Sequence, residues 1–129
     1  MTLLECIRKA EQILPGTAAL DGEPDPRWQA IIDVGEFIEQ DPDAVWEFAR
    51  RWGSYPDADL RDAIATCLIE HLLEHHFELM LPKIEQAIRA DPEFVETVQR
   101  CWAFGQADTP ANIKRLGRVL KVGKRARKI

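Results

Sequence analysis

The chain has 129 residues, of which 46% are hydrophobic and 30% are charged, and its formal net charge is −5. A chain of this length forms one domain, and this composition excludes an intrinsically disordered chain. No apolar run approaches the roughly 20 residues that span a bilayer, so we expect no membrane association.

The charge is divided unevenly along the chain. Residues 1–113 contain all 22 carboxylates and nine of the 17 basic residues, a formal charge of −13, whereas residues 114–129 contain eight basic residues and no carboxylate. An acidic body repels nucleic acid and attracts cationic partners. The charge pattern therefore favours binding over catalysis, and it makes nucleic acid a poor partner for most of the surface.

The predicted elements are all helical. The first helix, over residues 2–14, carries charges within its apolar part and is therefore amphipathic rather than a signal peptide. A loop rich in Pro, Gly and Asp follows at 15–25. Asp or Thr precedes Pro at residues 25, 41, 91 and 109, which predicts helix starts because the side-chain oxygen caps the first turn. With apolar residues at the helical period, the sequence predicts seven helices, at 2–14, 26–40, 42–53, 57–75, 78–90, 92–104 and 110–122.

These helices form a single domain over residues 1–122, followed by a flexible basic tail at 123–129. Residues 41–52 match residues 91–102 at an offset of 50, with Trp52 and Trp102 at equivalent places. Helical hairpins that recur at such a period are typical of a HEAT-like α-solenoid, and a compact right-handed bundle is the alternative. A chance match of two Asp-Pro helix starts is the third interpretation.

The residues that carry common chemistries are sparse. The three cysteines, Cys6, Cys67 and Cys101, are odd in number and lack a C-x-x-C spacing, which favours reduced, buried thiols in a cytoplasmic protein. The chain has one serine, Ser54, and no glycine-rich phosphate loop. We therefore expect no cofactor and no serine nucleophile.

One string is compatible with metal chemistry. His71-Leu-Leu-Glu74-His75 is an H-x-x-E-H motif on a predicted helix, the arrangement in which inverted zincins provide two zinc ligands and a general base. A metal-dependent hydrolase is therefore one hypothesis for the function. Against it, the motif needs a third ligand that the sequence does not place, and the histidines extend an apolar stripe beside which they can pack.

The basic C-terminal segment gives a second hypothesis, a nucleic-acid-associated HEAT-like protein. Ile113, Leu116 and Leu120 form one side of this amphipathic helix, and basic residues surround them. Clusters of this kind neutralise phosphates, although cations near a helix C-terminus also complement the helix dipole. No aromatic residue lies among the tail cations to stack on bases, which argues against nucleic acid.

The four tryptophans divide into two groups. Trp52 and Trp102 recur in the repeat, so we expect both in the core. Trp46 lies about 100° from the Val45 stripe on a helical wheel, which makes it either a core residue at the boundary or an exposed anchor for a partner.

Residues 28–113 also carry a longer pattern, formed by Trp28, Asp41-Pro42-Asp-Ala-Val-Trp46, Ile69-Glu70-His-Leu-Leu-Glu-His-His76, Asp91-Pro92-Glu-Phe94 and Trp102. The pattern resembles that of a family of small bacterial all-helical proteins with no assigned activity. The chain departs from it at Ile69 and Phe77, where the family has leucine and glycine. The resemblance implies a helical fold and, since members look like proteins encoded beside polymorphic toxins, an immunity role. It also implies that Trp46, Glu70 and His76 are characteristic residues.

The leading hypothesis is a non-enzymatic protein-binding module, an immunity protein that covers the cationic active-site cleft of a bacterial toxin, for example a nuclease. Acidic helix faces would provide steering and register, and an aromatic residue would provide affinity. The candidate partner-binding residues are Asp33, Glu36, Glu39, Asp43, Trp46 and Glu47 on one pair of helices, and Glu70, Glu74 and Glu78 on another.

Overall fold

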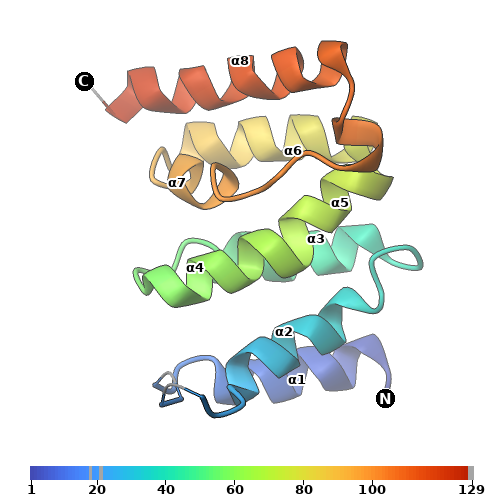
Figure 1. Ribbon diagram of the computed structural model, residues 1–129, viewed down its shortest axis with the longest axis vertical. Helices are drawn as coiled ribbons and strands as arrows, with labels where there is room; N and C mark the ends of the chain where they lie inside the picture. Colours follow the sequence, from blue (N-terminus) through green and yellow to red (C-terminus); the bar gives the residue numbers. More distant parts are fainter. Residues whose placement is uncertain (18, 21, 128–129) are drawn as a thin grey trace.

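A computed structural model describes residues 1–17, 19–20 and 22–127, and the side chains of these residues as far as Val122. The described residues form helices and no strand, which confirms the predicted all-α class (Figure 1). Within them, no helix has the length and apolarity needed to cross a membrane. The elements are α1 (Leu3–Ile13), α2 (Pro26–Gly35), α3 (Pro42–Trp52), α4 (Ala58–Ile64), the π-helical segment η1 (Ala65–Ile69), α5 (Glu70–His75), α6 (Phe77–Ala90), α7 (Phe94–Val98), the 3₁₀ turn η2 (Gly105–Ala107) and α8 (Pro110–Arg127).

Capped prolines begin three of the helices, as the sequence predicts. The Asp25 and Asp41 carboxylates accept backbone N–H bonds at the starts of α2 and α3, at 2.9 and 3.2 Å, and the Thr109 hydroxyl accepts one at the start of α8, at 3.1 Å. Each cap satisfies a donor that the first helical turn leaves unpaired.

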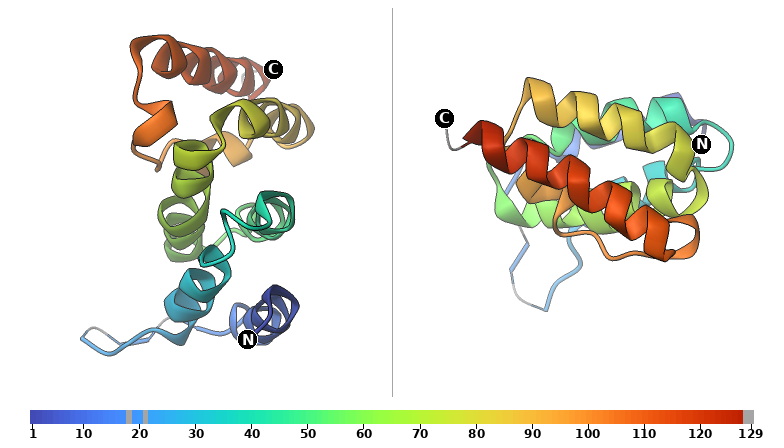
Figure 2. Two further views of the ribbon diagram at one scale, coloured as in Figure 1. Left: turned by 90° about the vertical axis from the view of Figure 1, so that its right-hand side faces the viewer. Right: turned by 90° about the horizontal axis from the view of Figure 1, so that it is seen from above.

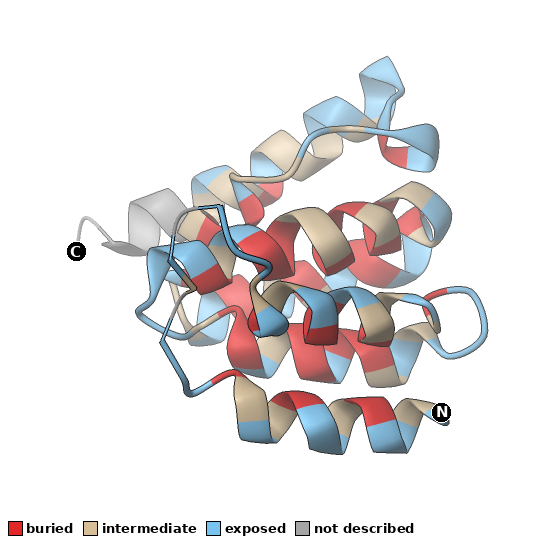
Figure 3. Cartoon of the chain, turned by 60° about the horizontal axis from the view of Figure 1, so that its bottom comes forward, coloured by how far each residue is buried: buried red, intermediate tan, exposed pale blue. Residues whose placement is uncertain are grey.

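The helices stack along the long axis of the molecule. In the left view of Figure 2, α1, α3 and α6 form one column and α2, α4 and α5 form the other, and α8 covers one end. Buried residues recur along one side of each of the stacked helices (red in Figure 3). The figures show stacked helices, and the choice between a solenoid and a bundle stays a prediction.

Several predicted helix boundaries are wrong. The helix expected at 26–40 ends at Gly35. The backbone N–H groups of residues 36–38 bond to carbonyls three residues back instead of four, so the chain there forms a tighter turn than an α-helix. The helix expected at 57–75 is continuous but contains η1, and the one expected at 110–122 extends to Arg127. The predicted flexible tail at 123–129 thus begins within α8, while residues 128–129 and the tail side chains lie outside the described part, so its flexibility stays a prediction.

The internal repeat is not reproduced in the structure. α3 has 11 residues, whereas α7, its counterpart in the second copy, has five. Trp52 is 4% exposed and Trp102 is 75% exposed, so the expectation that both are core residues is wrong for Trp102. The chain leaves the helix before Trp102 because the backbone N–H of this residue donates to the buried Glu70 carboxylate, at 3.0 Å.

A buried arginine joins the N-terminal ends of α2 and α4. The Arg27 side chain is 2% exposed, and its guanidinium donates to Asp57 at 3.0 Å and to Asp59 at 2.7 Å. Asp25, the cap of α2, lies 3.5 Å from the same group. The hydrogen bond from Arg27 lowers the pKa of the Asp57 carboxyl below its ordinary value of 3.8.

We expect Arg27→Met to lower the free energy of unfolding at pH 7 by about 1–2 kcal/mol, because two of the carboxylates left behind, Asp57 and Asp59, are nearly half exposed and stay hydrated. Because the folded-state pKa of Asp57 is lowered, the ion pair stabilises the protein above the unfolded pKa, and this contribution is lost as the pH falls through the folded value. Urea denaturation of the wild type and of Arg27→Met at pH 7 and pH 3 measures this contribution. The difference in the free energy of unfolding between the two proteins should be smaller at pH 3. An equal difference at both pH values would contradict the assignment, and Arg89→Met, at an exposed pair with Glu85, is the control.

Candidate functional site

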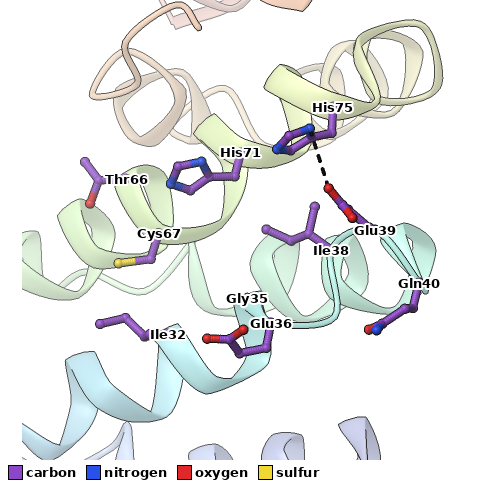
Figure 4. Close-up of a pocket in the computed structure, with 10 residues that line it drawn as sticks. All are labelled: Ile32, Gly35, Glu36, Ile38, Glu39, Gln40, Thr66, Cys67, His71 and His75. Carbon is purple, nitrogen blue, oxygen red and sulfur yellow. Dashed lines mark ion pairs between the residues drawn. The ribbon is translucent and has the colours of Figure 1, made fainter. Parts of the chain in front are cut away.

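An open groove of about 450 Å³ lies between the C-terminal end of α2 and the helix formed by η1 and α5 (Figure 4). The π-helical segment contributes one wall, and π-helical turns within α-helices occur frequently at functional sites. The side chains that give the groove its chemistry are Ile32, Glu36 and Glu39 on one wall and Cys67, His71 and His75 on the other.

The two histidines share one carboxylate. Glu74 Oε1 lies 2.9 Å from His71 Nδ1 and 3.4 Å from His75 Nε2. Across the groove, Glu39 Oε1 lies 4.0 Å from His75 Nδ1 (Figure 4). Both imidazole side chains are nearly half exposed and face the groove. One interpretation of the sequence had them pack beside the apolar stripe instead, and that interpretation is wrong.

The third imidazole has a structural contact. His76 Nε2 lies 3.1 Å from the carbonyl oxygen of Ile38, and because a carbonyl only accepts, this nitrogen carries the proton. The bond attaches the end of α5 to the turn that follows α2. His76 therefore holds the two walls of the groove together, and it lies outside the groove itself.

The arrangement of His71, Glu74 and His75 matters for the hydrolase hypothesis. The H-x-x-E-H residues do lie on one side of α5, but Glu74 lies between the two imidazoles, where it accepts from His71 and lies 3.4 Å from His75. In the part of the chain that the structure describes, no three His, Cys, Asp or Glu side chains are placed to hold a metal ion. The hydrolase hypothesis stays a prediction, and it has no ligand set in this geometry.

The groove thiol is not activated. Burial raises the pKa of Cys67, and the neighbouring Glu70 carboxylate raises it further. A thiol whose pKa is raised stays protonated near neutral pH and is a poor nucleophile. The groove is therefore better suited to binding than to covalent chemistry.

The structure separates the nine candidate partner-binding residues into three groups. Glu36 and Glu39 line the groove, and Glu74 lies beside it. Four others lie elsewhere. Asp43 and Glu78 form ion pairs, Asp43 with Lys83 at 3.3 Å and Glu78 with Arg115 at 2.6 and 2.9 Å. Asp33 accepts from Gln29 at 2.9 Å, and Glu47 lines a second hollow beside α1.

The remaining two candidates are buried and cannot contact a partner. Trp46 is 4% exposed and packs edge-to-face on Phe94, with ring centroids 6.0 Å apart. Glu70 is 7% exposed, and its carboxylate accepts the Trp102 N–H. Trp46 is thus a core residue rather than an anchor, and Glu70 organises the chain from within.

The feature that the sequence did not predict is a strap, residues 101–107, which lies along the η1–α5 helix (orange in Figure 1). Its N-terminal end is held by the Cys101 thiol on the Ala65 carbonyl and by the Glu70 bond to Trp102. Its other end is held by Gln106, whose amide accepts from Phe77 N at 3.0 Å and donates to His75 O at 2.8 Å.

Between these attachments the strap exposes two aromatic side chains. Trp102 is 75% exposed and Phe104 is 45% exposed. Glu74 connects the strap with the groove, because it contacts both histidines and lies directly against Gly105. The η1–α5 helix therefore contacts the strap, which carries the exposed aromatic residues, and also forms the groove wall that faces Glu36 and Glu39.

The chain matches no family model, no curated protein and no solved structure. The resemblance over residues 28–113, and the immunity role that it implies, therefore stay predictions. What the chain does has to be inferred from its own geometry.

Proposed function

We propose that this protein is a non-enzymatic protein-binding module that neutralises a bacterial toxin by covering a cationic active-site cleft. The observation that carries the proposal is an acidic groove on one side of the η1–α5 helix and an exposed tryptophan on the strap that lies along the same helix. Large aromatic residues flanked by complementary charge are the usual centres of tight protein interfaces.

The groove carboxylates are free to meet a cationic partner. Among the described residues, no lysine or arginine pairs with Glu36 or Glu39, in contrast to Asp43 and Glu78, whose charges are met by Lys83 and Arg115. Unneutralised carboxylates beside a hollow raise the local negative potential and speed the approach of a cationic surface. This supports steering of a partner toward the groove.

Trp102 provides the affinity that charge alone does not. Exposed ion pairs contribute about 0–1 kcal/mol each, whereas burying an anchoring tryptophan contributes about 2 kcal/mol or more. Because the strap is attached at both ends, its backbone loses little conformational freedom on binding. The partner would cover the groove and the strap together, and occlusion of its active site follows from that contact.

The test uses any toxin domain that is found encoded beside the gene for this chain. Inhibition of each purified domain and the association rate are measured as salt is raised. We expect Glu36→Gln and Glu39→Gln each to slow association about threefold at low salt, because steering depends on these charges, and we expect the difference to vanish at high salt.

Glu23→Gln is the matched control, since it removes one carboxylate from the exposed loop before α2 and should leave the rate unchanged. An association rate that does not respond to ionic strength would exclude the electrostatic mechanism. Failure to inhibit any of the domains would exclude the immunity role.

A further inference from the structure

The last helix has two faces of different character. α8 covers one end of the stack and packs on α6 and α7 (Figure 1). On its inner face Val119 is 6% exposed, and Leu116 and Leu120 pack against the core. Arg115 is held by Glu78 at 2.6 and 2.9 Å, with its guanidinium 5.3 Å from the centre of the Phe77 ring. Most of the inner face is thus engaged by the rest of the chain, while Ile113, near its N-terminal end, is 50% exposed.

The outer face is a row of cations. Lys114, Arg118 and Lys121 are exposed, and their i, i+4, i+7 spacing places them along one side of the helix over about 10 Å. The sequence from residue 109 onward contains no carboxylate. The carboxylate of Glu78, on the neighbouring α6, is already occupied by Arg115. The positive charge of this face is therefore not neutralised by the helix that carries it.

We propose that the outer face of α8 binds the phosphate backbone of double-stranded nucleic acid. Over about 10 Å, one strand of a duplex presents about three phosphates, which matches a row of three cations. The chain from Pro110 onward contains no aromatic residue, so the face offers nothing on which unpaired bases would stack. A rigid, purely cationic helix face fits a regular phosphate backbone and carries no means of reading base sequence.

The same observations argue against a lipid bilayer as the partner. A helix that binds at a membrane interface inserts its apolar side among the lipids. In α8, Leu116, Val119 and Leu120 of that side are already packed on the body of the protein, and the half-exposed Ile113 alone gives little apolar surface to insert. Leaving the body would expose Leu116, Val119 and Leu120 and break the Arg115–Glu78 pair.

The acidic body determines how a duplex can approach. Residues 1–113 carry a formal charge of −13, so a polyanion is repelled from most of the molecule and meets a positive surface only at the α8 end. The groove carboxylates Glu36 and Glu39 directly follow α2 in the chain, and α2 lies near the opposite end of the stack from α8 (Figure 2). The duplex site is therefore separate from the proposed partner site, and either could be lost without the other.

The experiment measures the binding of a short fluorescent DNA duplex by anisotropy as salt is raised. Arg118→Gln/Lys121→Gln is compared with Arg8→Gln/Lys9→Gln, which removes the same two charges from exposed positions on α1. Each phosphate contact contributes about 0.9 to the slope of log affinity against log salt. We expect the α8 variant to bind more weakly, with a slope shallower by about 2, and the α1 variant to behave as the wild type.

Two results would overturn this proposal. Equal affinity of the two variants would show that α8 is not the contact surface. Binding to vesicles that contain phosphatidylserine, with no binding to the duplex, would identify a membrane instead. The assay is independent of the proposed function, because Glu36→Gln should retain duplex binding and Arg118→Gln/Lys121→Gln should retain toxin inhibition.

Discussion

Trp46→Ala is expected to lower the free energy of unfolding by about 3–5 kcal/mol, the range for removing a large aromatic residue from a packed core. Trp46 is 4% exposed, and its edge-to-face contact with Phe94, from α7, joins distant parts of the stack. Removing the indole leaves a cavity between α3 and α7 that backbone atoms cannot fill. Urea denaturation measures the effect, and the m-value of the variant should equal that of the wild type, because only stability changes.

Trp102→Ala is the matched substitution, and we expect it to change partner affinity while leaving stability nearly unchanged. Because the side chain is 75% exposed, its removal should change the free energy of unfolding by less than about 0.5 kcal/mol. Affinity for an inhibited toxin domain should fall about 30-fold, which corresponds to about 2 kcal/mol for a central anchor. Normal affinity of the stable Trp102→Ala protein would remove the strap from the interface.

The helix starts could be predicted from sequence because their causes are local. An Asp or Thr oxygen before a proline satisfies the first turn whatever the rest of the chain does, and α2, α3 and α8 begin where this pattern occurs. The Asp91-Pro92 pair shows the limit of the rule, because α7 begins only at Phe94 and ends at Val98. A start signal sets neither the length of a helix nor its end.

The exposure of Trp102 could not be predicted, because the contact that accompanies it is long-range. Trp102 is exposed because its N–H bonds to Glu70, which lies 32 positions earlier in the chain, and this bond draws the backbone into the strap. Sequence similarity between residues 41–52 and 91–102 contains no trace of that contact. The one available signal was Glu70 itself, a carboxylate at a position that the helical period places among apolar residues.

The groove was partly predictable. Glu36, Glu39 and Glu74 were all candidate residues, but on two separate helix pairs, since the sequence does not say which helices pack together. The π-helical segment η1 adds a further difficulty, because a wider turn rotates all later residues around the helix axis. Leu60, Ile64 and Leu68 are buried while His71 and His75 face the groove, so the single stripe expected from a uniform period is divided.

Two glycines give a sharp test of how the strap is held. At Gly105 φ is +51°, and a Cβ added there would lie 2.7 Å from Glu74 Cγ and 2.9 Å from the Glu74 carbonyl oxygen. Gly105→Ala therefore combines an unfavourable backbone conformation with a clash against the backbone of α5. At Gly117, within α8, an added Cβ would meet no atom within 4 Å.

We expect Gly105→Ala to lower the free energy of unfolding by about 2 kcal/mol and Gly117→Ala to raise it by about 0.5–1 kcal/mol, since alanine is the better helix former. Gly105→Ala should also speed amide hydrogen exchange at Gln106 and Phe77, because the strap has to move away from α5. That movement would displace Trp102 from its fixed position, so toxin affinity should fall in Gly105→Ala although the indole is retained. Unchanged exchange at Phe77 would mean that the strap tolerates the extra methyl group, and that its attachment to α5 is looser than the contacts of Gln106 indicate.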